Sequence, residues 1–223
     1  MKIKTIIAIA LVIVILGLGY ILIRGIMRPV NFERDYNNRS AQVVNKLKDI
    51  RSIQEAFRSK YGRYCGDIDS LIVFAQTDKV PFIQRTGTIP DGKTEAQALK
   101  DGDLKKDTSY VSVVEKLYSS VLYQEKKGTV DSLGLFTPKD KIKDLKYIPF
   151  SDNQELFQLK AKMLDRSGVL VPVFEVLAPI ATYTKGMDDQ DIVNKTADLE
   201  SKSRYAGWKV GDLTQPIIDG NFE

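Results

Sequence analysis

The chain begins with a long, unbroken apolar segment. The residues from Thr5 to Ile23 carry no charged side chain, and Lys2 and Lys4 lie just before them. A helix of this length spans close to the roughly 30 Å hydrocarbon core of a bilayer, whereas the apolar part of a secretory signal usually has only about 7 to 15 residues. The residues that follow, beginning with Arg24, do not resemble an A-x-A cleavage site. We therefore predict an uncleaved transmembrane anchor; a cleaved signal and a buried hairpin helix are the alternatives.

A second helical pattern follows the anchor. Between Phe32 and Tyr61 there is no proline or glycine, and apolar residues recur every three or four positions, which predicts a long amphipathic helix ending at Gly62. Pro29, between the two patterns, is expected to bend the helix or to restart it. The apolar stripe is either the core of the domain or an interface to a partner, and it cannot serve fully as both. The candidate interface residues are Val43, Leu47, Ile50, Ile53, Phe57 and Tyr61.

Three shorter helices are predicted from their ends. One begins at 67–69, where an aspartate can cap it, and stops before the next proline. Another spans 94–100, because Thr94 and Gln97 fit a capping box. The third spans about 189–205 and starts with acidic residues.

The strand signals lie mainly in the second half of the chain. Apolar and polar residues alternate from Phe157 to Leu164, and the turn DRSG and the run VLVPVFEVLA follow, which predicts an antiparallel hairpin. Pro172 within the second strand requires an edge or a bulge. Residues 147–150 are expected to pair with the first strand as a third strand. The short mixed runs of 81–145 do not distinguish strands from loops.

These elements predict an α+β fold, in which a transmembrane helix continues into a long amphipathic stem helix packed on an antiparallel β-sheet. We divide the chain into an N-terminal tail and anchor, residues 1–28, and an exported domain, residues 29–223. Within the domain, 29–62 is the stem helix and 63–223 the globular part. We interpret the aromatic residues near the end of the stem as the contact between stem and sheet rather than as a ligand site. They are Phe57, Tyr61, Tyr64 and Phe74.

The charge of the chain argues against nucleic acid as a partner. The sequence has 33 Lys and Arg against 29 Asp and Glu, a formal net charge of +4. Lys2, Lys4 and Arg24 flank the apolar segment, so the rest of the chain is nearly neutral, without the basic excess of a phosphate-binding face. Basic residues on both sides of the anchor leave the positive-inside count undecided. The very short N-terminal tail favours export of the C-terminal domain.

The residue types also limit the possible chemistry. The chain has no histidine, which excludes Ser-His-Asp and Cys-His arrangements and every histidine-containing metal site. Asp188, Asp189 and Asp191 are compatible with calcium, but we interpret them as the acidic first turn of a helix, which the helix dipole and capping explain without a metal. Cys65 is the single cysteine, so no intrachain disulfide forms, and we interpret it as a small buried residue. We predict no catalytic, cofactor-binding or metal-binding residues and no enzyme.

The stretch AQVVNKLKDIRSIQEAFRSKYGRYCGDIDSL resembles the amphipathic stem of type IV pilins and type II secretion pseudopilins. In that family an I-x-x-I-x-x-A-(F/Y) helix ends in a G-x-Y turn. The order of apolar helix, stem and antiparallel sheet is also that of the family, and the resemblance covers about the first 75 residues. The matching positions here are Ile50, Ile53, Ala56, Phe57, Gly62 and Tyr64.

The chain departs from the pilins in its apolar segment. It has no glutamate there and no prepilin peptidase site, and in pilins the buried carboxylate guides each subunit into the fibre. We therefore expect a pilin-like shape without processing and without assembly into a fibre. The whole chain also resembles single-span envelope proteins of Bacteroidota, a resemblance that implies a cell envelope and supplies no activity.

Together these observations predict a function by association. We expect a single-pass protein of the bacterial inner membrane with its C-terminal domain in the periplasm, contacting the bilayer through Thr5 to Ile23. Its partners would be other envelope proteins, as a scaffold or accessory subunit of a protein export or surface-assembly complex, and an oligomer is compatible with this role. The alternative is a membrane-tethered periplasmic domain that binds a ligand or glycan. A third possibility, an enzyme of unfamiliar design, requires a pocket with a carboxyl pair or a Ser-Lys pair of perturbed pKa.

Overall fold

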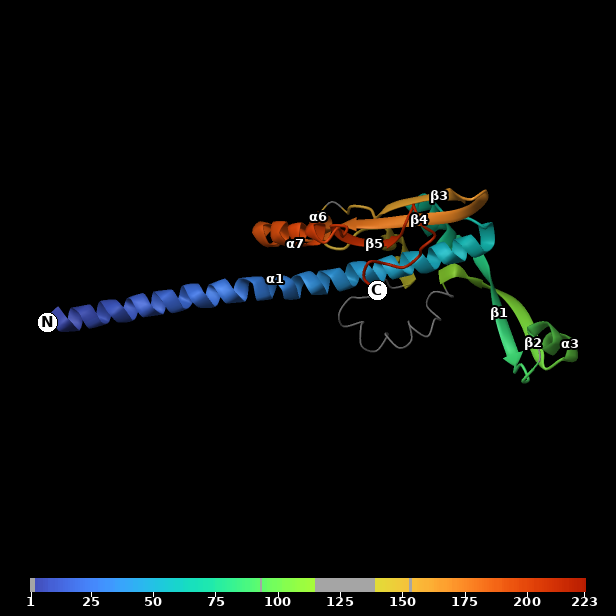
Figure 1. Cartoon of the computed structure of the whole chain (residues 1–223), viewed down its shortest axis with the longest axis horizontal. Coiled ribbons are helices and arrows are strands. Elements are labelled where there is room, and N and C mark those ends of the chain that lie inside the picture. The colour runs from blue at the N-terminus through green and yellow to red at the C-terminus, as the bar shows by residue number, and fades with distance from the viewer. Residues whose placement is uncertain (1–2, 93, 115–138, 153) are drawn as a thin grey trace.

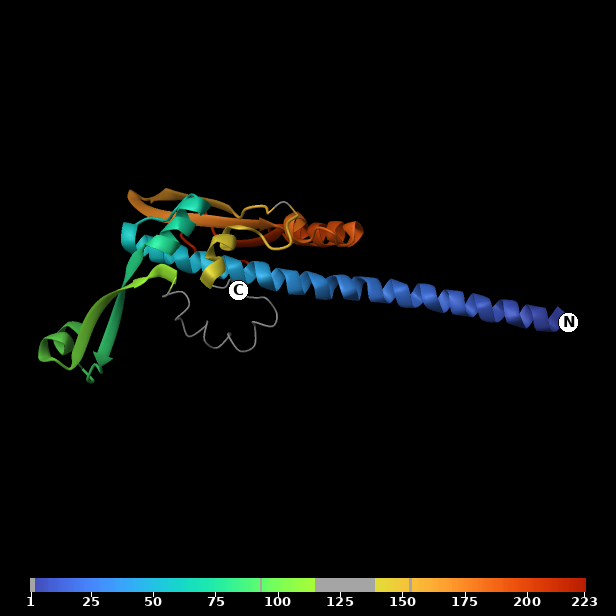
Figure 2. The same ribbon diagram turned by 180° about the vertical axis from the view of Figure 1, so that it is seen from behind.

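A computed structural model describes residues 3–92, 94–114, 139–152 and 154–223 of the chain. The fold is α+β, with one long N-terminal helix and two small antiparallel sheets. The helix α1 runs from Ile3 to Tyr61 without interruption, and the other elements gather along its C-terminal half (Figure 1). Seen from behind, the N-terminal half of α1 extends alone from the domain (Figure 2).

The free half of α1 is compatible with a single membrane span. Its most apolar window has a mean hydropathy of 2.4 and is 0% buried within the protein. Pro29 lies inside α1 and does not break it, so the predicted bend or restart at this residue is wrong. A proline removes only one main-chain donor, and the long helical segments on both sides keep their own hydrogen bonds.

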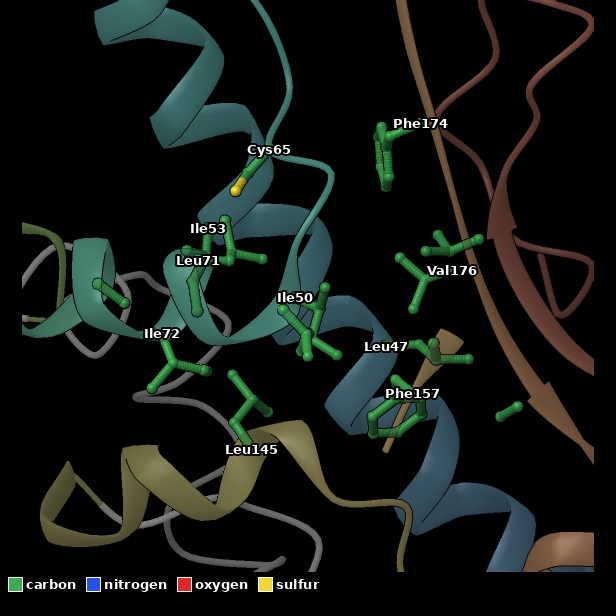
Figure 3. Close-up of a cluster of buried hydrophobic side chains, with 14 of the residues drawn as sticks. Leu47, Ile50, Ile53, Cys65, Leu71, Ile72, Leu145, Phe157, Phe174 and Val176 are labelled. Carbon is green, nitrogen blue, oxygen red and sulfur yellow. The ribbon is translucent and has the colours of Figure 1, made fainter. Parts of the chain in front are cut away.

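The C-terminal half of α1 is the centre of the hydrophobic core. Val43, Leu47, Ile50 and Ile53 are all completely buried. They pack against helix α2 (Ile68–Thr77), the 3₁₀-helix η2 (Lys139–Lys146) and the larger sheet (Figure 3). Of the two roles left open for the apolar stripe, the burial of these four residues favours the core, and in this fold they are not available as a surface.

The ends of the helices follow the sequence signals closely. Gly62 ends α1 with a φ of 70°, and its N–H bonds the Arg58 carbonyl at 2.8 Å. Asp67 caps α2 by accepting a hydrogen bond from the Ser70 N–H. Helix α3 (Glu95–Asp101) begins with the predicted capping box and ends at a left-handed glycine. Local polar groups therefore determine these boundaries, as predicted.

The larger sheet has three antiparallel strands in the order β3-β4-β5. Strands β3 (Gln158–Arg166) and β4 (Val169–Pro179) form the predicted hairpin. The third strand is β5 (Gly207–Gly211), so the expectation that residues 147–150 would supply it is wrong. Those residues contribute only an isolated bridge between Tyr147 and Leu156.

The predicted exception for Pro172 is confirmed by the pairing of β4. Pro172 lies opposite Met163 of β3, but the pairing of β4 with β5 begins only at Glu175. The proline is therefore in a part of β4 that has one neighbouring strand, as in an edge strand, where proline is tolerated.

Two further helices follow β4. They are α6 (Ile180–Tyr183) and α7 (Asp189–Ser201), and the predicted helix over 189–205 ends four residues early. We refer to residues 180–201 as the α6–α7 lobe. It lies beside α1 and extends from the sheet toward the free half of that helix (Figure 1).

The smaller sheet forms a separate arm. Strands β1 (Lys79–Gly87) and β2 (Leu104–Ser112) pair along their full length, and α3 lies between them in sequence. Figure 1 shows this pair projecting from the distal end of α1, away from the rest of the domain. We refer to residues 79–112 as the distal arm. The sequence predicted only the small helix of this region and left its strands unassigned, and residues 115–138 lie outside the described part.

The aromatic residues at the end of the stem join α1 mainly to α2. The ring of Phe57 lies 4.6 Å from Tyr61 and 5.0 Å from Phe74, between ring centroids. Tyr64 contacts the larger sheet, with its ring centroid 4.5 Å from that of Phe174 in β4. Phe74 lies on α2, so its ring contacts with Phe57 and Tyr61 join the stem to that helix.

Lys46 is expected to make the stability of the domain depend on pH. Its Nζ donates hydrogen bonds to the carbonyls of Asp144 and Tyr147 at 2.7 and 2.8 Å, and burial lowers its pKa to about 8. Because the folded state binds this proton more weakly than the unfolded state, Lys46 should add stability as pH rises from about 8 to about 10.5. We expect the free energy of unfolding of the wild type to rise relative to Lys46→Met over this window, by at most about 3 kcal/mol. Denaturation of both proteins at pH 7 to 10 tests this, and a constant difference would contradict it.

Candidate membrane-proximal site and distal arm

The α6–α7 lobe is fastened to α1 by charged side chains. Arg28 of α1 forms an ion pair with Asp188, and its Nε lies 3.6 Å from Asp191 Oδ2. One turn further along α1, Glu33 accepts a hydrogen bond from Lys195 Nζ at 3.0 Å. These contacts join residues about 160 positions apart, and they place the first turn of α7 beside the start of the stem.

Deeper contacts hold the base of the lobe. Arg39 Nη1 donates to the carbonyls of Tyr183 and Lys185 at 3.1 and 2.8 Å. The hydroxyls of Tyr36 and Tyr183 are 3.4 Å apart, and Tyr183 is completely buried, which raises its pKa. The lobe therefore combines a buried polar base with an exposed, ion-paired tip.

Of the aspartates singled out in the sequence, Asp188 caps α7, and Asp189 and Asp191 lie in its first turn. Asp188 accepts hydrogen bonds from the N–H groups of Gln190 and Asp191. The hydrogen bond from Arg28 is the main cause that lowers the pKa of Asp188. Among the residues that the structure describes, no group of three His, Cys, Asp or Glu side chains is arranged to hold a metal ion. Capping and ion pairing thus account for the placement of Asp188 and Asp191.

A shallow hollow lies between α1 and the tip of the lobe. Its volume is about 310 Å³ and it is open to solvent. Side chains of both signs line it, with arginines from α1 and aspartates from α1 and the lobe. The charged residues are Arg28, Asp35, Arg39, Asp188 and Asp191.

A second hollow, of about 330 Å³, lies near the C-terminus. Tyr36, Trp208 and Phe222 supply aromatic walls, and Arg204 supplies a cation. Trp208 Nε1 is buried without a hydrogen-bond partner. Aromatic walls with a few polar groups are typical of ligand sites, although this hollow is small and has no group prepared for catalysis.

The distal arm exposes most of its surface. Six consecutive residues of β2, 105–110, are exposed, and Tyr110 has 69% of its surface accessible. Near the tip, Glu95 of α3 lies 3.4 Å from Arg85 and 3.5 Å from Lys106, which attaches the small helix to the strands. An isolated two-stranded ribbon is only marginally stable in water, and its unpaired edges can bind further strands.

The remaining candidates for chemistry have structural roles. Cys65 is buried, its thiol donates to the Asp67 carbonyl at 3.2 Å, and burial raises its pKa, which disfavours the reactive thiolate. Lys46 has a lowered pKa but donates to two main-chain carbonyls. It therefore joins α1 to the segment around η2, a structural role, and does not act as the base of a Ser-Lys pair.

Comparison with known proteins gives no match: no family model, no curated protein and no solved structure resembles the chain significantly. The sequence singled out three aspartates of the lobe only as possible calcium ligands, and it did not indicate the arm. The pairing of two of these aspartates with Arg28 of α1 had no sequence signal, because the fold brings together residues about 160 positions apart.

Proposed function

We propose that the chain is a single-pass protein of the bacterial inner membrane, with its domain in the periplasm. In this proposal it acts as a scaffold or accessory subunit of a protein export or surface-assembly complex, and its mechanism is association. The observation that carries the proposal is the continuity of α1, which supplies both the apolar segment and the central helix of the core.

This continuity leaves no flexible linker between anchor and domain. The helix from Ile23 to Tyr61 is about 57 Å long at 1.5 Å per residue, so the distal arm is held at a defined distance from the bilayer. Anchoring also confines the domain to the membrane plane, which raises its effective concentration for partners in the same plane. A rigid stem with a projecting arm suits a protein that positions others.

The distal arm is the part of the domain best suited to contact a partner. It contributes little to the core, apart from buried residues at its base and tip such as Val80 and Leu104. Its exposed aromatic side chain, Tyr110, is of a type enriched at protein interfaces.

Site-specific crosslinking in the native membrane tests the proposal. A photoreactive residue at position 110 is expected to form reproducible adducts with envelope proteins. The matched control is position 169, because Val169 is also largely exposed, at 63%, but lies in the β3–β4 turn region outside the arm. We expect the adducts at 110 to decrease when residues 1–28 are removed, since partners would then no longer share the membrane plane.

Absence of adducts at position 110 in both forms, together with purification as a monomer, would contradict the scaffold role. The second candidate, a membrane-tethered domain that binds a ligand or glycan, would then be favoured. The specific observation in its support is the C-terminal hollow with the unpaired Trp208 Nε1. Trp208 is the single tryptophan of the chain, so its fluorescence reports on that hollow directly.

A further inference from the structure

Apolar side chains remain exposed on α1 beyond the predicted span. Ile26, Met27 and Val30 have 64%, 48% and 56% of their surface accessible, although they follow Ile23 by several residues. No part of the described domain covers them. In a bilayer, such residues lie at the boundary between hydrocarbon and headgroups, where neighbouring arginines extend their charged groups toward water.

The tip of the α6–α7 lobe lies at the same level along α1. Asp188 and Asp191 both contact Arg28, which lies between Met27 and Val30 on the helix. An ion pair requires its two side chains to be adjacent, so the first turn of α7 shares the depth of these apolar residues.

The dimensions of a bilayer place this level in the headgroup layer. Each polar layer is about 5 to 8 Å thick, and Arg28 follows Ile23 by about 7.5 Å of helix. A hydrocarbon boundary between Ile23 and Arg28 would bring the lobe tip closer to the hydrocarbon. The lobe tip therefore meets the headgroups for any boundary between these two residues.

We propose that residues 186–191, the membrane-facing edge of the α6–α7 lobe, rest on the lipid headgroups of the bilayer that holds α1. This inference depends on the proposed membrane anchoring. The edge carries Asp188, Asp189 and Asp191, and Arg28 neutralises part of this charge. Its chemistry fits a zwitterionic lipid surface, whose outermost group is an ammonium, better than an anionic one.

A second contact with the bilayer has a mechanical consequence. A single helical span can tilt within the membrane, whereas a span together with a lobe on the surface restricts that tilt on one side. The lobe would thus fix the direction in which the distal arm points.

Fluorescence quenching in vesicles tests the contact. The full-length chain with Cys65→Ser offers a background without thiols, into which Asp189→Cys, Val169→Cys or Leu16→Cys introduces one labelling position. Asp189 is exposed at the lobe edge, and Val169 is an exposed control on the β3–β4 hairpin. In phosphatidylcholine and phosphatidylethanolamine vesicles with a headgroup nitroxide, we expect quenching at 189 to exceed that at 169 at least threefold.

The three positions separate the possible failures. A label at 16 that is quenched by an acyl-chain nitroxide confirms the anchor; if it is not quenched, the anchoring proposal itself fails. With the anchor intact, equal quenching at 189 and 169 would overturn the lobe contact. Replacing the zwitterionic lipids by phosphatidylglycerol should lower quenching at 189, and unchanged quenching would overturn the charge argument.

Discussion

Gly211→Ala is expected to destabilise the domain by at least about 3 kcal/mol. Gly211 ends β5 with a φ of 75°, and a Cβ built on it would lie 2.3 Å from the Phe174 carbonyl oxygen of the adjacent strand. This oxygen belongs to the main chain of the buried central strand, so it cannot move aside as a flexible side chain would. The alanine must therefore push β5 away from β4, which loosens the core beneath Val210.

Gly186→Ala is the matched control for this prediction. Gly186 also has a φ of 75°, but no atom lies within 4 Å of the position its Cβ would take. It should cost only the backbone strain, about 1 kcal/mol. Denaturant unfolding in detergent micelles, followed by the fluorescence of Trp208 on the same strand, measures both. Equal losses in the two variants would show that the close approach to Phe174 contributes nothing.

The close approach at Gly211 also explains why the third strand escaped prediction. Residues 147–150 and 207–211 both contain aromatic and β-branched residues, and pattern alone did not separate them. Which segment pairs with β4 depends on the space beside that strand. Gly207 and Gly211 have no Cβ, so the main chain of β5 can approach that of β4 closely. Such complementarity lies between distant segments and leaves no periodic signal.

Features that depend on neighbouring residues were predicted well. The Thr94 capping box, the end of α1 at Gly62 and the β3–β4 hairpin each arise from interactions within a few residues. The apolar stripe on the stem was also recognised, although a stripe indicates only that a face is covered and not what covers it. The structure supplies the cover from α2, η2 and the sheet.

The candidate sites were the least predictable part. The lobe depends on Arg28 meeting Asp188, and the arm depends on β1 and β2 pairing away from the core. Exposed charged residues look alike in sequence whether they are solvated or join two elements. The buried contact between Gln54 of the stem and Cys65 was missed for a related reason, since the sequence gives Gln54 the character of an ordinary polar helix residue.

Gln54→Met is expected to cost about 2 to 5 kcal/mol of folding free energy. Gln54 is completely buried, and its amide bonds both main-chain groups of Cys65: Nε2 donates to the carbonyl at 2.7 Å and Oε1 accepts from the N–H at 2.9 Å. Methionine fills a similar volume but leaves both groups without a partner. The exposed neighbour Glu55, changed to methionine, controls for the substitution itself and should alter stability by less than about 0.5 kcal/mol.

Gln54→Glu tests whether the hydrogen bonds, rather than the shape, are responsible. A protonated carboxyl can donate to the Cys65 carbonyl and accept from its N–H as the amide does, whereas a buried carboxylate cannot donate and is poorly solvated. The folded state should therefore raise the pKa of this glutamate above its usual value of about 4.3. Relative to the wild type at the same pH, Gln54→Glu should be nearly as stable below about pH 4.3 and lose stability as pH rises through the raised pKa. If the stability difference between Gln54→Glu and the wild type stayed constant between pH 4 and 8, the hydrogen bonds would not be responsible. The packing of the Gln54 side chain would then be what stabilises the turn after α1.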